Sequence, residues 1–456
     1  MAASHDARHE WYYPIRLATR TFWLVSDTNH SECSFFYPRH VLDCIRQSLL
    51  YTRKFAVAPG RQFVVPLSQA HFDGVSALIG NWNHSAADRA RAEAFLDGLR
   101  IEGRESVELA TSRLVAAEDA DEVAAAALVI LDCGEREDAK LLLEKLAEGE
   151  LETCFAIGRG LRLALIGKIL DDLQRLMDHS TAITRAAIAD VLSFHRSKIA
   201  IDLGDLARHD EPMVRRYAAE SAGRTRDSSH QAFVRNLIAD PIPTVRRSAL
   251  CAAARLSLQG LGDICRTRAV ADNPCRESIE FFAVCGTESD ARLLVQLTKN
   301  EKTSLAAVKS MGGVGAPVLI LYLIELMADP VLGDAAAQSL ERIAFYSVPR
   351  GDPPQPPPDA TEEELDFWNP PSPPIPELAK AWWHENKSLF SNGRRYQAGV
   401  CISENPLGEH FDQLPDEVRY DLYMRERALG NLSVPDWELE TWPQHERNPS
   451  WALRKG

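Results

Sequence analysis

The sequence lacks the long apolar runs that mark membrane and secreted proteins. No stretch approaches the ~20 consecutive apolar residues that a helix needs to cross a bilayer. The first residues, Met1 to Pro14, contain no apolar core of the kind that a secretory signal peptide requires. We therefore expect a cytoplasmic protein that makes no membrane contact.

Paired cysteines and catalytic motifs are also missing. The nine cysteines are odd in number and never form a Cys-x-x-Cys pair, which argues against a disulfide framework and a structural zinc site. The spacings of a serine nucleophile elbow, a zinc protease, a phosphate-binding loop and an EF-hand are absent. His179, His195, His209 and His230 lack the spacing that puts two imidazoles on one metal ion, so we interpret them as solvated turn residues. The sequence thus predicts no enzyme, no metal and no cofactor.

Charge is acidic overall but unevenly distributed along the 456 residues. The net charge of −14 argues against wholesale nucleic-acid binding. Residues 185–270 nevertheless hold 14 basic and nine acidic residues, whereas residues 351–456 hold ten basic and 19 acidic residues. The middle of the chain is therefore suited to an acidic surface, including that of its own tail. The alternative is two solvated faces of opposite bias.

An internal repeat is the main positive signal. The aspartates of four acidic turns, Asp178, Asp210, Asp240 and Asp272, lie 32, 30 and 32 residues apart, and a degenerate copy at Asn300 leads on to Asp329. Each turn precedes a run of small and apolar residues at helical spacing, and a second apolar segment follows in most copies. Such helix pairs bury their apolar faces only by stacking on neighbours. The sequence predicts an all-α fold, an α-solenoid of helical repeats.

The repeat resembles a known family. The pattern Asp-x-x-x-x-Val-Arg-Arg-x-Ala, best preserved at Asp210 and Asp240, resembles HEAT repeats of the type found in phycobilisome-lyase-like proteins. The resemblance implies that an acidic residue of one repeat pairs with an arginine of a neighbour. It gives a structural role to Asp178, Asp210, Asp240, Arg185, Arg215 and Arg246.

Segments outside the repeat extend the resemblance. They are Phe95 to Ile101, Trp382-Trp383 with Arg395-Tyr396, and Leu414-Pro415 through Arg425-Glu426-Arg427. Together with the repeats they resemble a family of bacterial HEAT-repeat proteins that are often encoded near type VI secretion genes. The resemblance implies no activity that can be assigned to particular residues.

The composition divides the chain into four regions. We expect a mixed N-terminal segment over 1–90, with strand-like stretches at 55–57 and 62–65, and the HEAT-like solenoid over 91–348. Residues 349–378 form a proline-rich linker, for which an SH3-type ligand is the alternative to a spacer. Residues 379–456 form an appended aromatic-rich region whose tryptophans either fasten it to the last repeat or contact a partner.

Candidate binding residues follow from placing the second helix of each repeat on the concave face. Arginines then recur there at about one per repeat and suit a carboxylate- or phosphate-bearing partner. They are Arg208, Arg235, Arg266, Arg268 and Arg292. Trp437 and Trp442 are candidates for a peptide that contacts a partner, or for a strap over the same chain. The alternative is that the arginines are merely exposed and solubilising.

These observations favour a non-catalytic protein-interaction module. We expect a scaffold, an adaptor or an immunity-type binder with an acidic protein partner, such as a type VI effector or secretion component. A bilin-lyase-like enzyme is an alternative that the repeat's resemblance alone suggests. A HEAT-like nucleic-acid binder is a further alternative, which the basic middle of the chain suggests.

Overall fold

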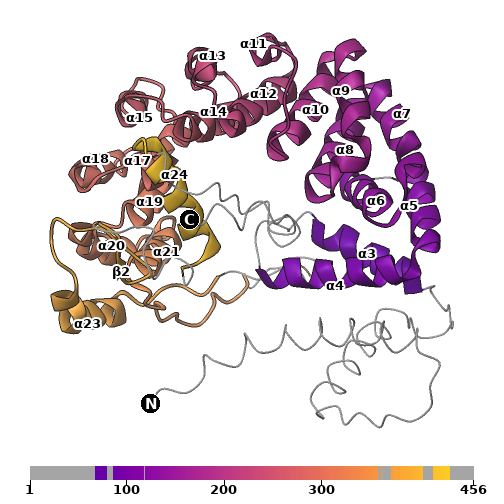
Figure 1. Cartoon of the computed structure of the whole chain (residues 1–456). Helices are drawn as coiled ribbons and strands as arrows, with labels where there is room; N and C mark the ends of the chain where they lie inside the picture. Colours follow the sequence, from indigo (N-terminus) through magenta and orange to yellow (C-terminus); the bar gives the residue numbers. More distant parts are fainter. Residues whose placement is uncertain are drawn as a thin grey trace, which may run out of the picture. The chain divides into compact units, whose positions relative to one another are not determined.

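The computed structural model describes residues 67–79, 86–117, 119–357, 361, 371–403 and 414–431. Almost all regular structure in these ranges is helical, and the single sheet there has two short strands (Figure 1). The prediction of an all-α fold is therefore confirmed. The strand-like stretches expected at 55–57 and 62–65 lie outside the described residues. None of the described helices is long and apolar enough to cross a membrane.

The chain divides into two compact units. Unit 1 comprises residues 1–142 and 159–168, and unit 2 comprises residues 143–158 and 169–456. The division therefore falls within α7 (Lys140–Glu148) and α8 (Leu151–Leu163).

Unit 1 is built around one buried helix. Its helices are α3 (Leu67–Ile79), α4 (Ala86–Glu102), α5 (Arg104–Ala116) and α6 (Ala120–Cys133), followed by η1 (Arg136–Ala139). Every residue from Val123 to Leu131 in α6 is buried, so this apolar helix forms the centre of the unit. Arg100 donates to Asp132 over 2.5 Å and to Glu93 over 3.0 Å, which ties α4 to α6. The segment Phe95 to Ile101 therefore packs and pairs inside unit 1.

Unit 2 contains two rows of helices. The inner row is α10 (Ala182–Phe194), α12 (Pro212–Thr225), α14 (Pro243–Arg255), α16 (Arg276–Glu280) with α17 (Phe282–Cys285), α19 (Glu301–Val314) and α21 (Gly333–Ala344). The outer row is α9 (Leu170–His179), α11 (Leu203–Leu206), α13 (Gln231–Leu237), α15 (Leu261–Ala269), α18 (Ala291–Leu297) and α20 (Ile320–Leu326). Inner helices contact one another in sequence order, and each outer helix contacts an inner one (Figure 1).

Small residues let the inner helices approach closely. A Cβ atom added to Gly223 would lie 2.8 Å from Cα of Ala252, and one added to Gly312 would lie 2.9 Å from Cα of Ser339. Alanines on these helices, such as Ala218, Ala249 and Ala253, are fully buried. The small-residue runs of the sequence are thus the surfaces along which successive repeats pack.

The inner helices end in a repeated way. Arg196, Arg226 and Ser257 follow α10, α12 and α14 at steps of 30 and 31 residues, and all three adopt the left-handed conformation. Gly315 and Phe345 do the same after α19 and α21. A left-handed residue at this point turns the chain out of the helix. After α10, α12, α14 and α19 it therefore turns the chain from the inner helix towards the outer helix that follows.

Arginines join neighbouring repeats through the acidic turns. Arg215 of α12 donates to both carboxylate oxygens of Asp240, over 2.7 and 3.0 Å. Arg246 of α14 donates over 2.8 Å to Glu277 of the next repeat. Arg185 reaches only the carbonyl of Ser180, over 3.0 Å. The fork-shaped guanidinium thus connects consecutive turns, because it can donate to a carboxylate and to carbonyls together.

The other two turn aspartates act differently. Asp210 offers its backbone carbonyl to Arg215 over 2.8 Å, and Asp178 lies in the last turn of α9. Asn300 caps α19 by accepting from the amide of Lys302 over 3.0 Å. Asp240 accepts from the amide of Ile242, and α14 starts only at Pro243, so the helix does not start at the proline directly after the aspartate.

The proline-rich stretch closes on itself at its two ends. Arg350 and Pro374 form an antiparallel bridge, and the amide of Gly351 donates to the carbonyl of Pro373 over 2.8 Å. Helix α23 (Pro376–Asn386) follows and contacts α20. Trp382 of α23 stacks on Tyr346, with ring centroids 4.2 Å apart. These contacts attach α23 to the end of the repeat array.

The appended region also covers the ends of the inner helices. Strands β1 (Tyr396–Gln397) and β2 (Val400–Cys401) form a hairpin, and α24 (Asp416–Ala428) packs on α14 and α17. Arg395 donates to the carbonyls of Val314 and Gly313 over 2.6 and 3.1 Å. Gln397 donates to Gly312 over 2.8 Å. These groups satisfy carbonyls that the end of α19 leaves unpaired.

Helix α24 makes the same kind of contact one and two repeats earlier. Arg425 donates over 2.7 Å to the carbonyl of Gly286, just after α17. Arg427 donates over 2.8 Å to the carbonyl of Arg255 at the end of α14. Cationic groups are favoured at helix C-termini, where the carbonyl dipoles are negative. We call this set of contacts from Arg395, Gln397, Arg425 and Arg427 the helix-end clamp.

Candidate binding groove between α13 and α15

The arginines that the sequence singled out lie on the outer row. Arg235 belongs to α13, Arg266 and Arg268 to α15, and Arg292 to α18, while Arg208 directly follows α11. Within unit 2 the outer row lies on the side of the inner row opposite α24, and the rows bend towards α24 (Figure 1). The prediction that the second helices of the repeats line the concave face is therefore wrong. Helix α24, which carries part of the clamp, occupies the inner side of the two rows, and the second helices lie on the outer side (Figure 1).

Two of the five arginines are already engaged. Arg208 pairs with Asp205 over 2.5 Å, and both side chains are largely exposed. Arg266 donates to both oxygens of Asp290 over 2.7 and 3.0 Å, and to Asp263 over 2.8 Å. Arg266 is thus part of a link between repeats rather than a free surface cation.

The remaining three have no carboxylate partner among the described residues. Arg235 donates only to the backbone carbonyl of Gln259, over 3.3 Å. The Nε atom of Arg268 is buried and has no hydrogen-bond partner there. Arg292 is exposed on α18. A guanidinium that lacks a partner in the protein is suited to an external anion.

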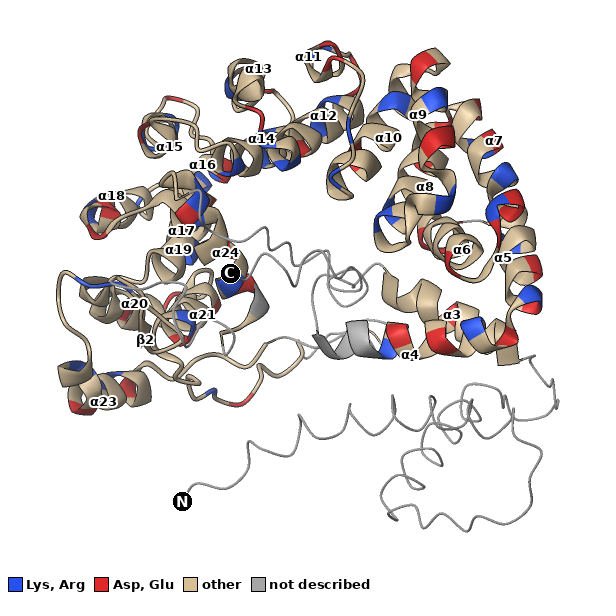
Figure 2. Cartoon of the chain, viewed as in Figure 1, with Lys and Arg blue, Asp and Glu red and all other residues tan. Residues whose placement is uncertain are grey.

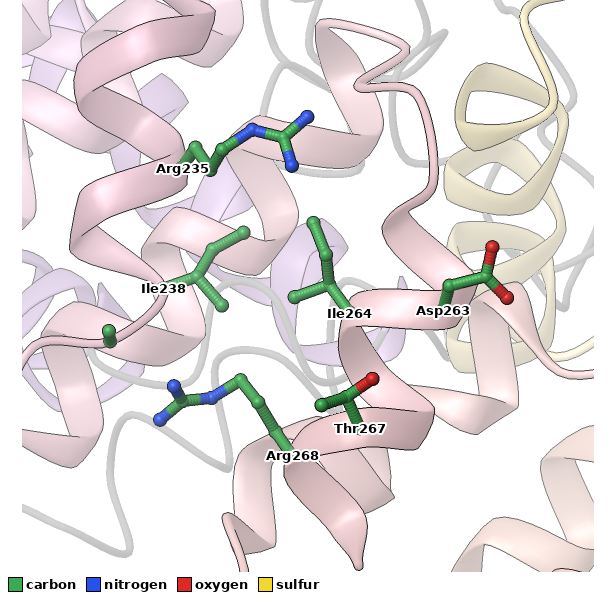
Figure 3. Close-up of a pocket in the computed structure, with 7 residues that line it drawn as sticks. Arg235, Ile238, Asp263, Ile264, Thr267 and Arg268 are labelled. Atoms are coloured by element: carbon green, nitrogen blue, oxygen red, sulfur yellow. The ribbon is translucent and has the colours of Figure 1, made fainter. Parts of the chain in front are cut away.

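Arg235 and Arg268 line one groove. It lies between α13 and α15, has a volume of about 320 Å³ and is open to solvent. Its lining residues are Arg235, Ile238, Ala239, Asp263, Ile264, Thr267 and Arg268. Figure 3 shows Ile238 and Ile264 between the two guanidiniums. The groove therefore presents an apolar centre with a cation on either side.

Helical spacing produces this lining. Arg235 and Ile238 are three residues apart at the end of α13, and Ile264, Thr267 and Arg268 are three and four apart on α15. Residues at these spacings share a helix face. The neighbouring faces are used for packing: Val234 and Leu237 of α13 and Cys265 of α15 are buried. Helices α13 and α15 thus each turn one face to the inner row and a second face to the groove.

The electrostatics of the groove are positive. Its one carboxylate, Asp263, is 82% exposed and already accepts a hydrogen bond from Arg266. Hydrogen bonding to Asp290 raises the pKa of Arg266 above its usual value. Burial opposes the ionisation of Asp290, but donation from Arg266 and Thr287 prevails and lowers the pKa of Asp290. The pair of Arg266 and Asp290 therefore stays charged, and Asp263 is hydrogen-bonded to Arg266 rather than to Arg235 or Arg268.

The other candidates divide into described and undescribed residues. Trp437 and Trp442 lie outside the described residues. No group of three or more metal-ligating side chains occurs among the described residues, and the Nδ1 atom of His209 accepts from the amide of Glu211 over 3.0 Å. The sequence did not predict that Gln397 and Arg425 belong to the clamp. Their partners are backbone carbonyls that lie up to 141 residues away, and no sequence pattern points to them.

Comparison with known proteins finds no family model and no curated protein that matches this chain. A function for the chain must therefore be argued from the groove and the surfaces described above.

Proposed function

We propose that the chain is a non-catalytic protein-interaction module whose outer row binds an acidic partner. The observation that carries the proposal is the groove between α13 and α15, in which Arg235 and Arg268 flank an apolar centre and lack a carboxylate partner among the residues that the structure describes. Arginine is enriched at the centres of protein interfaces, where desolvated contacts supply most of the affinity. On the strength of the family resemblance, we propose an adaptor or immunity-type binder of a type VI secretion system.

Charge distribution supports a protein rather than a nucleic acid as the partner. Figure 2 shows basic and acidic residues interspersed along helices of unit 2, for example on α9 and α12. Nucleic-acid binding requires a continuous set of cations that follows the phosphate backbone. Two cations separated by isoleucines favour discrete carboxylates on a protein surface.

The test is capture from a lysate of the source organism with a photo-reactive amino acid in place of Thr267. Thr267 is exposed in the groove, so a bound partner comes within reach of the probe. We expect one reproducible protein, whose yield falls at least about tenfold, or about 1.4 kcal/mol, in the double variant Arg235→Glu/Arg268→Glu.

A matched control is Arg175→Glu on α9, an arginine that is 70% exposed and does not line the groove. It should capture the partner as well as the wild-type chain does. Equal capture by the double variant, or capture of nucleic acid instead of protein, would contradict the proposal.

A further inference from the structure

The groove between α13 and α15 has a chemistry more specific than a general affinity for acidic proteins. Its volume of about 320 Å³ lies at the lower end of the range for ligand sites. A space of this size holds one or two side chains rather than a large cofactor. If the partner is a protein, as proposed above, the occupant is a short stretch of polypeptide that inserts side chains.

The order of the lining residues defines what such a stretch must carry. Ile264 is half-buried and packs beside the buried Ile238, so the centre of the groove offers an apolar surface. Arg235 and Arg268 lie on either side of that centre (Figure 3). Two cations separated by apolar side chains match two separate anions better than they match a single phosphate group.

The buried Nε atom of Arg268 points to the same ligand. It has no hydrogen-bond partner among the described residues, and an unpaired buried donor is unfavourable. Asp263 is engaged by Arg266 and is mostly exposed, so it does not supply the missing acceptor. The terminal Nη atoms of Arg268 also have no hydrogen-bond acceptor among the described residues, so a carboxylate from outside the chain can pair with them.

We infer that the groove binds a partner peptide in which two carboxylates flank one branched aliphatic side chain. The aliphatic side chain contacts Ile238 and Ile264, and the carboxylates pair with Arg235 and Arg268. This inference rests on the proposed function, because it names the part of the partner that the outer row recognises.

The experiment measures fluorescence anisotropy of the full chain with defined peptides. The probe is a fluorescein-labelled peptide in which two glutamates flank one leucine, each separated from it by one glycine. We expect saturable binding that weakens about tenfold when both glutamates are replaced by glutamine, and about as much when leucine is replaced by serine. Added salt should weaken binding further, since exposed charge pairs are screened.

Variants of the chain complete the test. Arg235→Gln and Arg268→Gln should each weaken binding of the probe several-fold, whereas Arg175→Gln should leave it unchanged. Equal affinity for the glutamine peptide, or full displacement by inorganic phosphate where sodium chloride of equal ionic strength does not displace it, overturns the inference. Tighter binding of a synthetic peptide spanning Asp436 to Trp442 assigns the groove to this chain's own segment and also overturns it.

Sedimentation tests whether a second copy of the chain is the occupant. A mass that rises with concentration in the wild type but not in Arg235→Gln, without binding of the probe, would overturn the inference in favour of self-association. Failure of the inference and of the proposed function are distinguishable. Groove-dependent capture from lysate without peptide binding refutes only the peptide chemistry, whereas peptide binding without any captured protein refutes only the proposed function.

Discussion

The guanidinium of Arg427 on α24 donates through Nη2 to the backbone carbonyl of Arg255 at the end of α14, over 2.8 Å. In the same place Oγ of Ser257 donates over 2.7 Å to the carbonyl of Arg427. Ser257 and Arg427 are 170 positions apart in the sequence. The contact fastens the appended region to the middle of the repeat array and not only to its last repeat.

Replacement of Arg427 should therefore destabilise unit 2. Arg427 is only 2% exposed, and burial lowers the pKa of its guanidinium. We expect Arg427→Ala to lower the free energy of unfolding by about 2 kcal/mol, because a hydrogen bond from a charged donor is lost with the buried side chain. Urea unfolding followed by tryptophan fluorescence measures this difference.

The variant Arg427→Met separates packing from hydrogen bonding. Methionine fills much of the same space but cannot donate, so it should recover part of the loss if burial contributes. Wild-type stability in both variants would show that the contact of Arg427 with α14 does not hold the clamp together.

The ion pair between Arg215 and Asp240 should make the free energy of unfolding decrease at low pH. Burial opposes ionisation of Asp240, but hydrogen bonds from Arg215 and from the amide of Ile242 outweigh it and lower its pKa below the usual value of 3.8. A carboxyl group with a lowered folded-state pKa stabilises the fold above its unfolded pKa, and this contribution is lost as the pH falls through the folded-state value. Asp240→Asn should cost about 2 kcal/mol at pH 7.

The difference in free energy of unfolding between the wild type and Asp240→Asn should shrink as the pH falls below about 4. The carboxylate of Asp240 then takes up a proton, so the wild type also loses the ion pair. Urea unfolding at a series of pH values measures it. Asp272→Asn, at an exposed aspartate of the next turn, is the matched control and should follow the wild-type curve. A constant difference at all pH values would argue against the ion pair as its source.

The close contact between α17 and α19 should not tolerate a methyl group at Gly313. A Cβ atom there would lie 2.3 Å from Cβ and 2.5 Å from Cα of Ala283. Over-packing of this kind costs about 1–3 kcal/mol. It exceeds the gain of about 1 kcal/mol that alanine brings to a helix. We expect Gly313→Ala to lower the midpoint of urea unfolding.

Gly262→Ala provides the comparison. The nearest atom to an added Cβ at Gly262 is Nη1 of Arg266, at 3.4 Å, and that flexible side chain can move. This variant should unfold at the wild-type urea concentration or slightly above it. The close-packing argument fails if Gly313→Ala is as stable as Gly262→Ala.

Removal of the groove's only carboxylate should strengthen binding of an acidic peptide. Among the residues that line the groove, Asp263 alone is acidic, and it accepts from Arg266 over 2.8 Å while Arg266 keeps its two bonds to Asp290. Asp263→Asn therefore removes a repelling charge without freeing Arg266. We expect affinity for the two-glutamate peptide to rise about two- to fivefold, as measured by fluorescence anisotropy at low salt.

Asp205→Asn removes another exposed carboxylate from the outer row, beside Arg208 and away from the lining of the groove. It should leave the affinity unchanged. An equal rise in both variants would indicate a general effect of net charge rather than recognition within the groove.

The sequence by itself determined the all-α fold and the repeat. Small residues at helical spacing after each acidic turn can only be buried by helix against helix, so the spacing of Val245, Ala249 and Ala253 was sufficient to predict the buried face of their helix. The pairing of Arg215 with Asp240 agrees with what the family resemblance implied for those two residues. The spacing of small and apolar residues predicts the buried face of a helix because that face is formed by residues three and four positions apart in the sequence.

Tertiary structure alone decided which surfaces are available. Arg266 and Arg268 are two residues apart on α15 and look equivalent in the sequence. In the structure Arg266 donates to Asp290, whereas Arg268 lines the groove. Arg395, Arg425 and Arg427 look like surface cations but meet the carbonyl ends of three inner helices. These partners are backbone atoms brought close by stacking, and a backbone carbonyl leaves no mark in the amino-acid sequence.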